Sequence, residues 1–347
     1  MLIYLHVAST IVVRGLERYE AINSNDVAAK FQIAKRLPAE SYENFEEMLK
    51  IHSKLKIEFR KILKEADASI LKEPPAEYSF LHLKRDILLH MLKNCRFCER
   101  RCGVNRYEKF GFCRCSSLSY YSSEFLHFGE EPELIPSHTI FFNRCTFACV
   151  FCQNYDIVYS DDYIFDAREM ARIVDIRRKH GSRNVNLVGG NPDQHSHKII
   201  EMLIYVESNV PIVWNSNMYH SDELAEVIED VVDVWLGDFK YGNDKCALKY
   251  SKAPNYWEVV TRNFLRAKDN GELLIRHLVM PNHVNCCTEK VVEWVSKNLG
   301  SDVRFNLMFQ YYPTYKAFQY PDIARRLNDE EMKNSLFVAA KHLKNLV

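Results

Sequence analysis

Apolar residues in the first quarter of the chain recur at helical spacing. Over residues 43–66 they fall three or four positions apart, which predicts an amphipathic helix. Pro74 and Pro75 interrupt the pattern, and a second helix is expected at about residues 78–93. We therefore expect residues 1–93 to form a helical N-terminal extension that packs on the remainder of the protein.

Beyond residue 130 short apolar runs alternate with amphipathic stretches. The runs, each a predicted strand, are residues 138–142, 184–188, 210–214, 231–237, 273–279 and 303–309. The predicted helices are residues 167–180, 195–208, 222–230, 256–270 and 288–299. Strands that alternate with helices predict βαβ units and a parallel sheet. Six strands are fewer than the eight of a complete TIM barrel, so an α/β fold with a partial (β/α)6 barrel or a doubly wound sheet is expected.

This organisation divides the chain into four segments. They are the helical extension at residues 1–93, a Cys-rich segment at 94–130, the barrel at 131–315 and a C-terminal helical segment at 316–347.

Charge and hydropathy narrow the classes of function. Lys plus Arg and Asp plus Glu both total 46, so the formal net charge is zero, and no overall charge favours nucleic acid or a membrane surface. No apolar stretch is long enough to span a bilayer. Residues 1–13 are apolar but lack a basic leading region and a clean cleavage site, so they predict a buried strand or the start of a helix rather than a signal peptide. A cytoplasmic protein is expected.

Eleven cysteines are many for such a protein, and they are clustered. In a reducing compartment, clustered thiols indicate metal ligation rather than disulfides. Cys145, Cys149 and Cys152 follow directly on the first predicted strand, at the end where α/β barrels assemble their sites. Thiolates favour zinc or an iron–sulfur cluster. A structural zinc site needs four ligands, and no fourth Cys or His follows nearby. Three thiolates on a four-iron cluster leave one iron open.

The spacing CxxxCxxC, with the aromatic Phe151 before the third cysteine, resembles the signature of the radical S-adenosylmethionine (SAM) superfamily. The resemblance implies a [4Fe–4S] cluster on Cys145, Cys149 and Cys152, whose open iron binds the methionine part of SAM. It also implies that Phe151 lies near the adenine. In this superfamily, reduction of bound SAM yields methionine and a 5′-deoxyadenosyl radical, which abstracts hydrogen from a substrate. Structural zinc is the main alternative.

The ends of the later predicted strands support the same resemblance. Gly189-Gly190-Asn191-Pro192 resembles the GGEP motif that contacts SAM, with Asn191 in place of the usual Glu. Glycines there are expected to let the backbone approach a ligand. Asp238-Phe239-Lys240 resembles an Asp-x-Lys stretch of glycyl-radical activating enzymes. Barrel geometry places a larger set at the SAM or substrate cavity: Gly189, Gly190, Asn191, Asn215, Asn217, Asp238, Lys240 and Arg276.

From Cys95 to about residue 327 the chain resembles radical SAM proteins related to pyruvate formate-lyase-activating enzyme. The matching segments are residues 102–106, 127–132, 152–154 and 189–190. The resemblance implies an oxidoreductase that takes hydrogen from a glycine of a partner protein and receives electrons from a flavodoxin- or ferredoxin-like donor. Two alternatives stay open: modification of a peptide or small metabolite, and a metal-binding scaffold without catalysis.

A second group, Cys95, Cys98, Cys102 and Cys113, begins with CxxC and predicts another metal site. Zinc and an auxiliary iron–sulfur cluster are both open, and Cys115 is the spare thiol.

Other chemically capable residues receive plainer interpretations. Cys286 and Cys287 are expected to be free thiols, and a catalytic role for Cys246 is a minor hypothesis. His195 and His197 are expected to be solvated or to cap a helix.

Overall fold

The computed structural model describes residues 15–347, so the prediction for residues 1–13 lies outside it. One sheet has the strand order β3-β1-β2-β4-β5-β6-β7-β8, and the run from β2 to β8 is parallel. The strands are β1 (Tyr120–His127), β2 (Ser137–Phe142), β3 (Tyr163–Ile164), β4 (Asn184–Gly189), β5 (Ile212–Ser216), β6 (Val234–Asp238), β7 (Glu272–Leu278) and β8 (Arg304–Met308).

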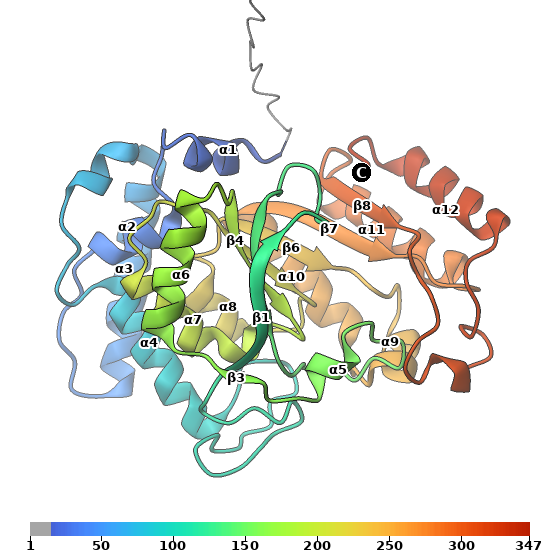
Figure 1. Ribbon diagram of the computed structural model, residues 1–347, viewed down its shortest axis with the longest axis horizontal. Helices are drawn as coiled ribbons and strands as arrows, with labels where there is room; N and C mark the ends of the chain where they lie inside the picture. The colour runs from blue at the N-terminus through green and yellow to red at the C-terminus, as the bar shows by residue number, and fades with distance from the viewer. Residues whose placement is uncertain (1–14) are drawn as a thin grey trace, which may run out of the picture.

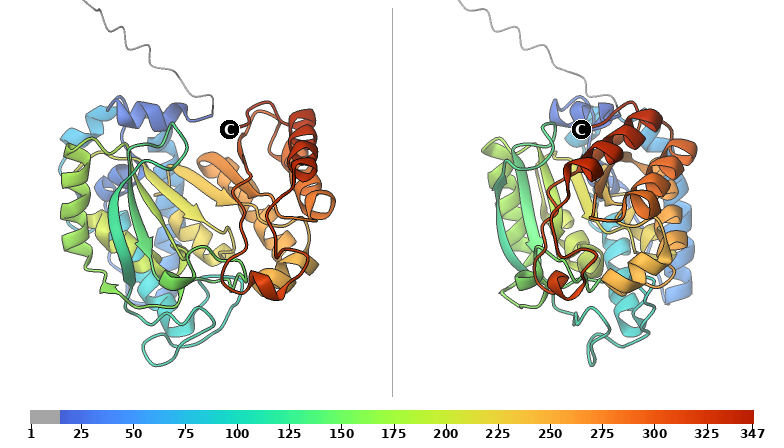
Figure 2. Two further views of the ribbon diagram at one scale, coloured as in Figure 1. Left: turned by 45° about the vertical axis from the view of Figure 1, so that its right-hand side comes forward. Right: turned by 90° about the vertical axis from the view of Figure 1, so that its right-hand side faces the viewer.

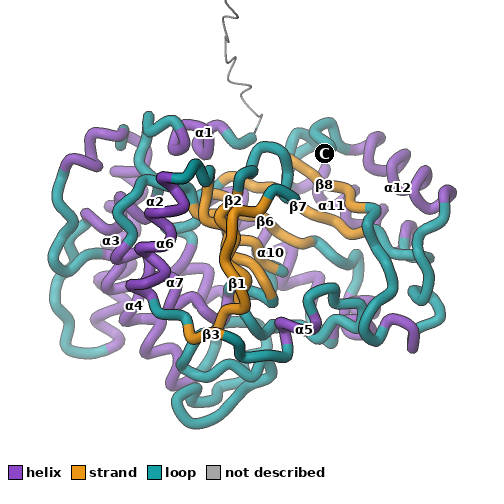
Figure 3. The backbone as a smooth tube through the Cα atoms, in the orientation of Figure 1, coloured by secondary structure: helices purple, strands orange, loops and turns teal. Residues whose placement is uncertain are grey.

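The parallel strands lie next to one another in chain order, whereas a doubly wound sheet would reverse its order part-way. The predicted α/β partial barrel is therefore confirmed, with the helices around the strands (Figures 1 and 3). The α-helices are α1 (Glu17–Asn23), α2 (Lys30–Arg36), α3 (Phe45–Glu65), α4 (Phe80–Met91), α5 (Tyr155–Val158), α6 (Ala167–Lys179), α7 (Ser196–Tyr205), α8 (Asp222–Ile228), α9 (Asp244–Ser251), α10 (Tyr256–Asn270), α11 (Glu289–Asn298) and α12 (Asp329–His342). Within residues 15–347 no helix is both long and apolar enough to cross a bilayer.

The structure adds elements that the hydrophobic pattern did not predict. β1 lies inside the expected Cys-rich segment and pairs antiparallel with β2 and with β3. Nearly all of its residues are half-buried, so its sequence has no clear alternation of apolar and polar positions. α9 is a helix of only 8 residues, too short for a periodic signal.

The helices before the barrel pack closely on it. α4 lies against α7 and α8, and one hydrophobic core extends through these helices and the barrel. The Lys84 ammonium is fully buried and donates to Asp230 at 2.8 Å and to the Val227 carbonyl at 2.7 Å. A buried charge is tolerated only with such partners, so this contact fixes α4 against α8. Because the core is continuous, the boundaries proposed between segments stay a prediction.

The β1–β2 connection helps to close the barrel at β8, the last strand of the sheet. Glu133 accepts from Arg304 on β8 at 2.6 Å. Glu131 accepts from Arg276 on β7 at 2.6 and 2.8 Å, and from Asn306 on β8 at 2.7 Å. This connection lies at the end of the barrel opposite α5 and α9 (Figures 1 and 2). Residues 345–347 also pair with β8 through Phe305, so buried ion pairs and this short bridge together cover this side of the barrel.

Loss of the Glu131 carboxylate should destabilise the fold. Its side chain has no exposed area, and Glu131→Ala leaves Arg276 without its bidentate partner. We expect the free energy of unfolding to fall by about 3 kcal/mol, measured by urea denaturation. Glu46→Ala, which removes an exposed partner of Lys50, is the matched control and should change it by less than about 0.5 kcal/mol. Equal effects of the two variants would contradict the closing role of Glu131.

Candidate functional site

A cavity of about 250 Å³ opens at the carboxyl ends of the parallel strands. Every strand from β4 to β8 contributes to it, and the loop after β2 brings three cysteines. Its lining is Cys145, Phe147, Cys149, Phe151, Cys152, Gln153, Asn154, Val158, Val188, Gly189, Gly190, Asn191, Asn215, Asn217, Asp238, Lys240, Arg276, Leu278, Met308 and Gln310. All of the residues predicted for the first cluster and for SAM therefore line one cavity.

The cysteine loop after β2 is held by the end of α9. The Ser251 carbonyl accepts from the Ala148 amide at 3.0 Å, and the Tyr250 carbonyl accepts from the Val150 amide at 2.8 Å. The Ser251 hydroxyl lies 2.9 Å from the Cys149 sulfur. An irregular loop becomes rigid only through such contacts, so α9 determines where Cys149 lies.

The environment of these thiols opposes their ionisation. Burial raises the pKa of Cys145, Cys149 and Cys152, the last to about 12, and the neighbouring Cys149 thiol acts in the same direction on the other two. Lys240, paired with Asp238 at 2.6 Å, acts in the opposite direction on all three. Thiolate ligands in such a place require a bound cation. Three soft donors facing one cavity fit a cluster with an open iron.

The two glycines after β4 are required by close packing with the β2 end. A Cβ on Gly190 would lie 1.7 Å from the Arg144 carbonyl oxygen, and one on Gly189 would lie 2.3 Å from the Phe142 backbone. Gly189 also has φ of +106°. Both glycines also line the cavity, and the approach of their backbone to a ligand stays a prediction. They seat the cysteine loop against β4.

Two of the three predicted asparagines at the cavity hold neighbouring loops together, and the third has an unpaired side-chain donor. Asn191 is buried and accepts from the Asn217 amide at 3.1 Å, so it joins the ends of β4 and β5. The Asn217 side chain donates to the Thr146 hydroxyl at 2.9 Å. The Asn215 amide nitrogen is buried at the cavity and finds no partner among the described residues. An unsatisfied donor is costly, so Asn215 is suited to hold a bound group.

The remaining predicted residues are placed as follows. Arg276 lines the cavity, but its guanidinium is engaged by Glu130 and Glu131. Phe151 is buried, with edge contacts to Tyr241 and Tyr311.

Sequence reasoning missed several residues that shape the cavity. Gln153 and Asn154 adjoin the third cysteine and could have been found from that position. Leu278 and Met308 line the cavity as ordinary apolar strand residues and carry no signal in the sequence.

The second cysteine group also converges. Cys95, Cys98, Cys102 and Cys113 line one enclosed space, whereas Cys115 does not line it and donates to the Cys113 carbonyl. Arg106 is buried and donates to the Gln194 carbonyl at 2.8 Å, which joins this segment to the loop after β4.

The expectation that His195 and His197 are solvated or capping was wrong. Both are buried, and they hydrogen-bond the carbonyls of Asn143 and Ser117, each at 2.8 Å. Phe142 and Asn143 at the end of β2 cover the His195 ring, and Phe97 and Ser117 of the Cys-rich segment cover the His197 ring. The local sequence could not show these contacts.

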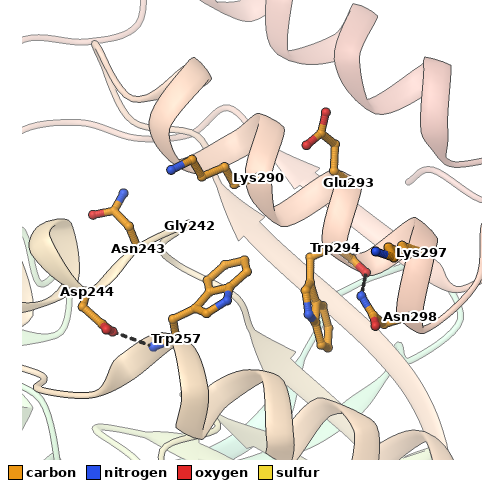
Figure 4. Close-up of a pocket in the computed structure, with 9 residues that line it drawn as sticks. All are labelled: Gly242, Asn243, Asp244, Trp257, Lys290, Glu293, Trp294, Lys297 and Asn298. Atoms are coloured by element: carbon orange, nitrogen blue, oxygen red, sulfur yellow. Dashed lines mark hydrogen bonds between the residues drawn. The ribbon is translucent and has the colours of Figure 1, made fainter.

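A larger depression, of about 640 Å³, lies between α10 and α11 (Figure 4). Trp257 and Trp294 face it, together with Lys290, Glu293 and Lys297. No thiol lines it, so the clustered cysteines distinguish the barrel cavity as the candidate site.

Comparison with known proteins agrees with this geometry. Residues 139–295 match the family model described as Radical SAM superfamily. The chain carries a radical SAM domain. It is also 47% identical, over 345 residues, to the uncharacterized protein MJ0674 of Methanocaldococcus jannaschii, a match that covers 96% of this chain and 99% of that protein. The chain belongs to one family with MJ0674.

Solved structures give more distant matches. Streptococcus suis SuiB bound to S-adenosylmethionine is 12% identical with a TM-score of 0.44, covering 58% of this chain and 47% of SuiB. The chain thus matches about half of SuiB. A structure of TYW1 with a lysine-pyruvate adduct is 12% identical with a TM-score of 0.41, covering 60% of this chain and 74% of that one. Methylornithine synthase (PylB) is 13% identical with a TM-score of 0.40, covering 57% and 60%.

The unpartnered Asn215 amide gives a test of the cavity as a SAM site. Asn215→Ala should weaken SAM binding roughly ten-fold, the cost of about one hydrogen bond, in equilibrium dialysis of the anaerobic protein. Asn186→Ala is the matched control, because Asn186 is also buried and unpartnered but does not line the cavity. Equal affinities of the Asn215 variant and the wild type would contradict the assignment.

Proposed function

We propose that the protein is a cytoplasmic radical SAM enzyme that abstracts hydrogen from a substrate bound at the barrel cavity. The observation that carries the proposal is the convergence of Cys145, Cys149 and Cys152 on a cavity that every later strand end also lines. A radical SAM domain implies a [4Fe–4S] cluster and SAM, and the three thiols, the lysine and the free amide at this cavity fit both.

The chemistry of the bound cluster is the one-electron reduction of SAM to methionine and a 5′-deoxyadenosyl radical. The chain's own residues bind, orient and shield. The cysteine loop, braced by α9, sets the cluster position. Lys240 supplies positive charge beside the thiolates. The Asn215 amide donates to a ligand oxygen, and Phe151 offers an apolar ring edge to a flat base.

For the substrate we propose a glycine of a partner polypeptide, with electrons supplied by a flavodoxin- or ferredoxin-like protein. The support is the resemblance of four short segments to activating enzymes. One of these segments contains Glu130 and Glu131, which the structure places on Arg276 at the cavity.

SAM cleavage tests the enzyme assignment directly. Protein reconstituted anaerobically with iron and sulfide, then given dithionite and SAM, should release 5′-deoxyadenosine, measured by liquid chromatography. Cys149→Ala should reduce the yield by at least about a hundred-fold, because one cluster ligand is lost. Cys115→Ala, which alters a thiol outside the cavity, should retain the wild-type yield.

If the wild-type protein binds iron but yields no 5′-deoxyadenosine, the chain is a metal-binding scaffold without catalysis. The substrate is tested separately, by electron paramagnetic resonance on a candidate partner. A doublet that changes when the partner's glycine is deuterated supports glycyl-radical formation. Turnover of SAM without such a signal favours a peptide or metabolite substrate.

We further propose that Cys95, Cys98, Cys102 and Cys113 hold a second iron–sulfur cluster. The sulfur ligands of a single tetrahedral zinc ion lie about 3.8 Å from one another, because each Zn–S bond is near 2.3 Å. Among the described residues, three such ligand atoms lie within 4.8 Å of one another in Cys246, Cys286 and Cys287, whereas the sulfurs of Cys95, Cys98, Cys102 and Cys113 form no such group. The wider spacing around an enclosed space suits a cluster, whose cysteines bind separate irons.

Metal analysis separates the two candidates for this second group. Wild-type protein should contain about eight irons per chain, and Cys98→Ala about four, with the zinc content unchanged. Inductively coupled plasma mass spectrometry measures both metals. Loss of one zinc with full iron would instead identify a structural zinc site.

A further inference from the structure

A third group of thiols lies in the connections after β6 and β7. The sulfurs of Cys246, Cys286 and Cys287 all lie within 4.8 Å of one another, and those of Cys286 and Cys287 are 3.9 Å apart. Cys287 is buried and the other two are half-buried. Cys286 and Cys287 were expected to be free thiols and Cys246 was a minor catalytic candidate. Cys246 lies 40 residues before Cys286, and nothing in the sequence indicated that the three would meet.

Two connections on the carboxyl side of the barrel bring the sulfurs together. Cys246 lies in the first turn of α9, after β6, and the two vicinal cysteines lie in a single π-helical turn, Val284–Thr288, after β7. π-helical turns are rare in proteins, and those that occur are often found at functional sites. Gly242 is required for the approach, because a Cβ there would lie 2.7–2.8 Å from the Cys286 and Cys287 backbone.

A histidine lies beside the sulfurs in an orientation suited to metal binding. The His283 ring is buried, and its Nδ1 donates to the Pro281 carbonyl at 2.6 Å. That bond fixes the proton on Nδ1 and leaves the Nε2 lone pair free, as carbonyl partners do for metal-ligating histidines. The Cys246 and Cys286 thiols both act electrostatically on this ring, so it adjoins the sulfurs, although its nitrogens lie outside their 4.8 Å group.

We propose that Cys246, Cys286, Cys287 and His283 form a structural zinc site. Tetrahedral zinc with Zn–S bonds near 2.3 Å places its sulfurs about 3.8 Å apart, close to the separation of the Cys286 and Cys287 sulfurs. Three thiolates and one imidazole are a closed ligand set for zinc. A cluster is disfavoured, because its cysteines bind separate irons and stand farther apart.

The ion would act on the radical SAM site through α9. Cys246 lies near the start of this helix and Ser251 at its end, where the Ser251 carbonyl and hydroxyl hold the cysteine loop. Asn243 caps α9 through the Cys246 amide at 2.8 Å and donates to the Cys286 carbonyl at 2.9 Å. Zinc would therefore lock the two connections together and fix the helix that positions Cys149.

Metal content of purified protein tests the site without any measurement of activity. We expect about one zinc per chain in wild type and in the control Cys115→Ala, and near none in Cys246→Ala or in Cys286→Ala. Iron should be unchanged in all four, which separates this result from any failure of the cluster assignments. Circular dichroism shows whether each variant is folded.

X-ray absorption at the zinc edge gives a second readout on wild-type protein alone. It should show three sulfurs at about 2.3 Å and one nitrogen at about 2.0–2.1 Å. The proposal is overturned if both variants keep the wild-type zinc content, if they lose iron instead, or if wild-type protein from cells supplied with zinc contains no zinc. Rapid alkylation of Cys286 in the native protein without zinc release would also overturn it.

Discussion

The cysteine loop after β2 has no regular structure of its own, and the candidate site depends on what holds it. The Ser251 and Tyr250 carbonyls at the end of α9 accept hydrogen bonds from the Ala148 and Val150 amides. The Ser251 hydroxyl also contacts the Cys149 sulfur. On the opposite side, Gly190 packs so closely on Arg144 that no side chain fits between them. These contacts from β4 and α9 fix where three buried thiols face the cavity.

The cavity in turn depends on the closure of an incomplete barrel. Six parallel strands leave an open side, and the β1–β2 connection covers it with carboxylates that pair with Arg276 and Arg304. Arg276 thus connects the closing segment to the cavity wall. Because Arg276 takes part in both, a change in its pairing with the β1–β2 connection would alter the wall of the cavity.

Metal-binding potential is distributed around the carboxyl ends of the strands. One thiol group faces the cavity, a second lies in the segment before β1, and the third lies between the start of α9 and the turn after β7. Since α9 touches the first group at Ser251 and carries Cys246 of the third, the two are mechanically connected. An ion at the third would stiffen the support of the first.

The sequence by itself determined the parallel α/β class and predicted the first thiol group, because both depend on local features: strand runs alternate with helices, and Cys145, Cys149 and Cys152 fall within one loop. Since strand ends of a barrel meet at one rim, the positions of Asn215, Asp238 and Lys240 also followed. Tertiary structure alone decided the burial of His195, the pairing of Glu131 with Arg276, and the meeting of Cys246 with Cys286. Each of these joins residues far apart in the chain, and local periodicity carries no information about which distant side chains packing will bring into contact.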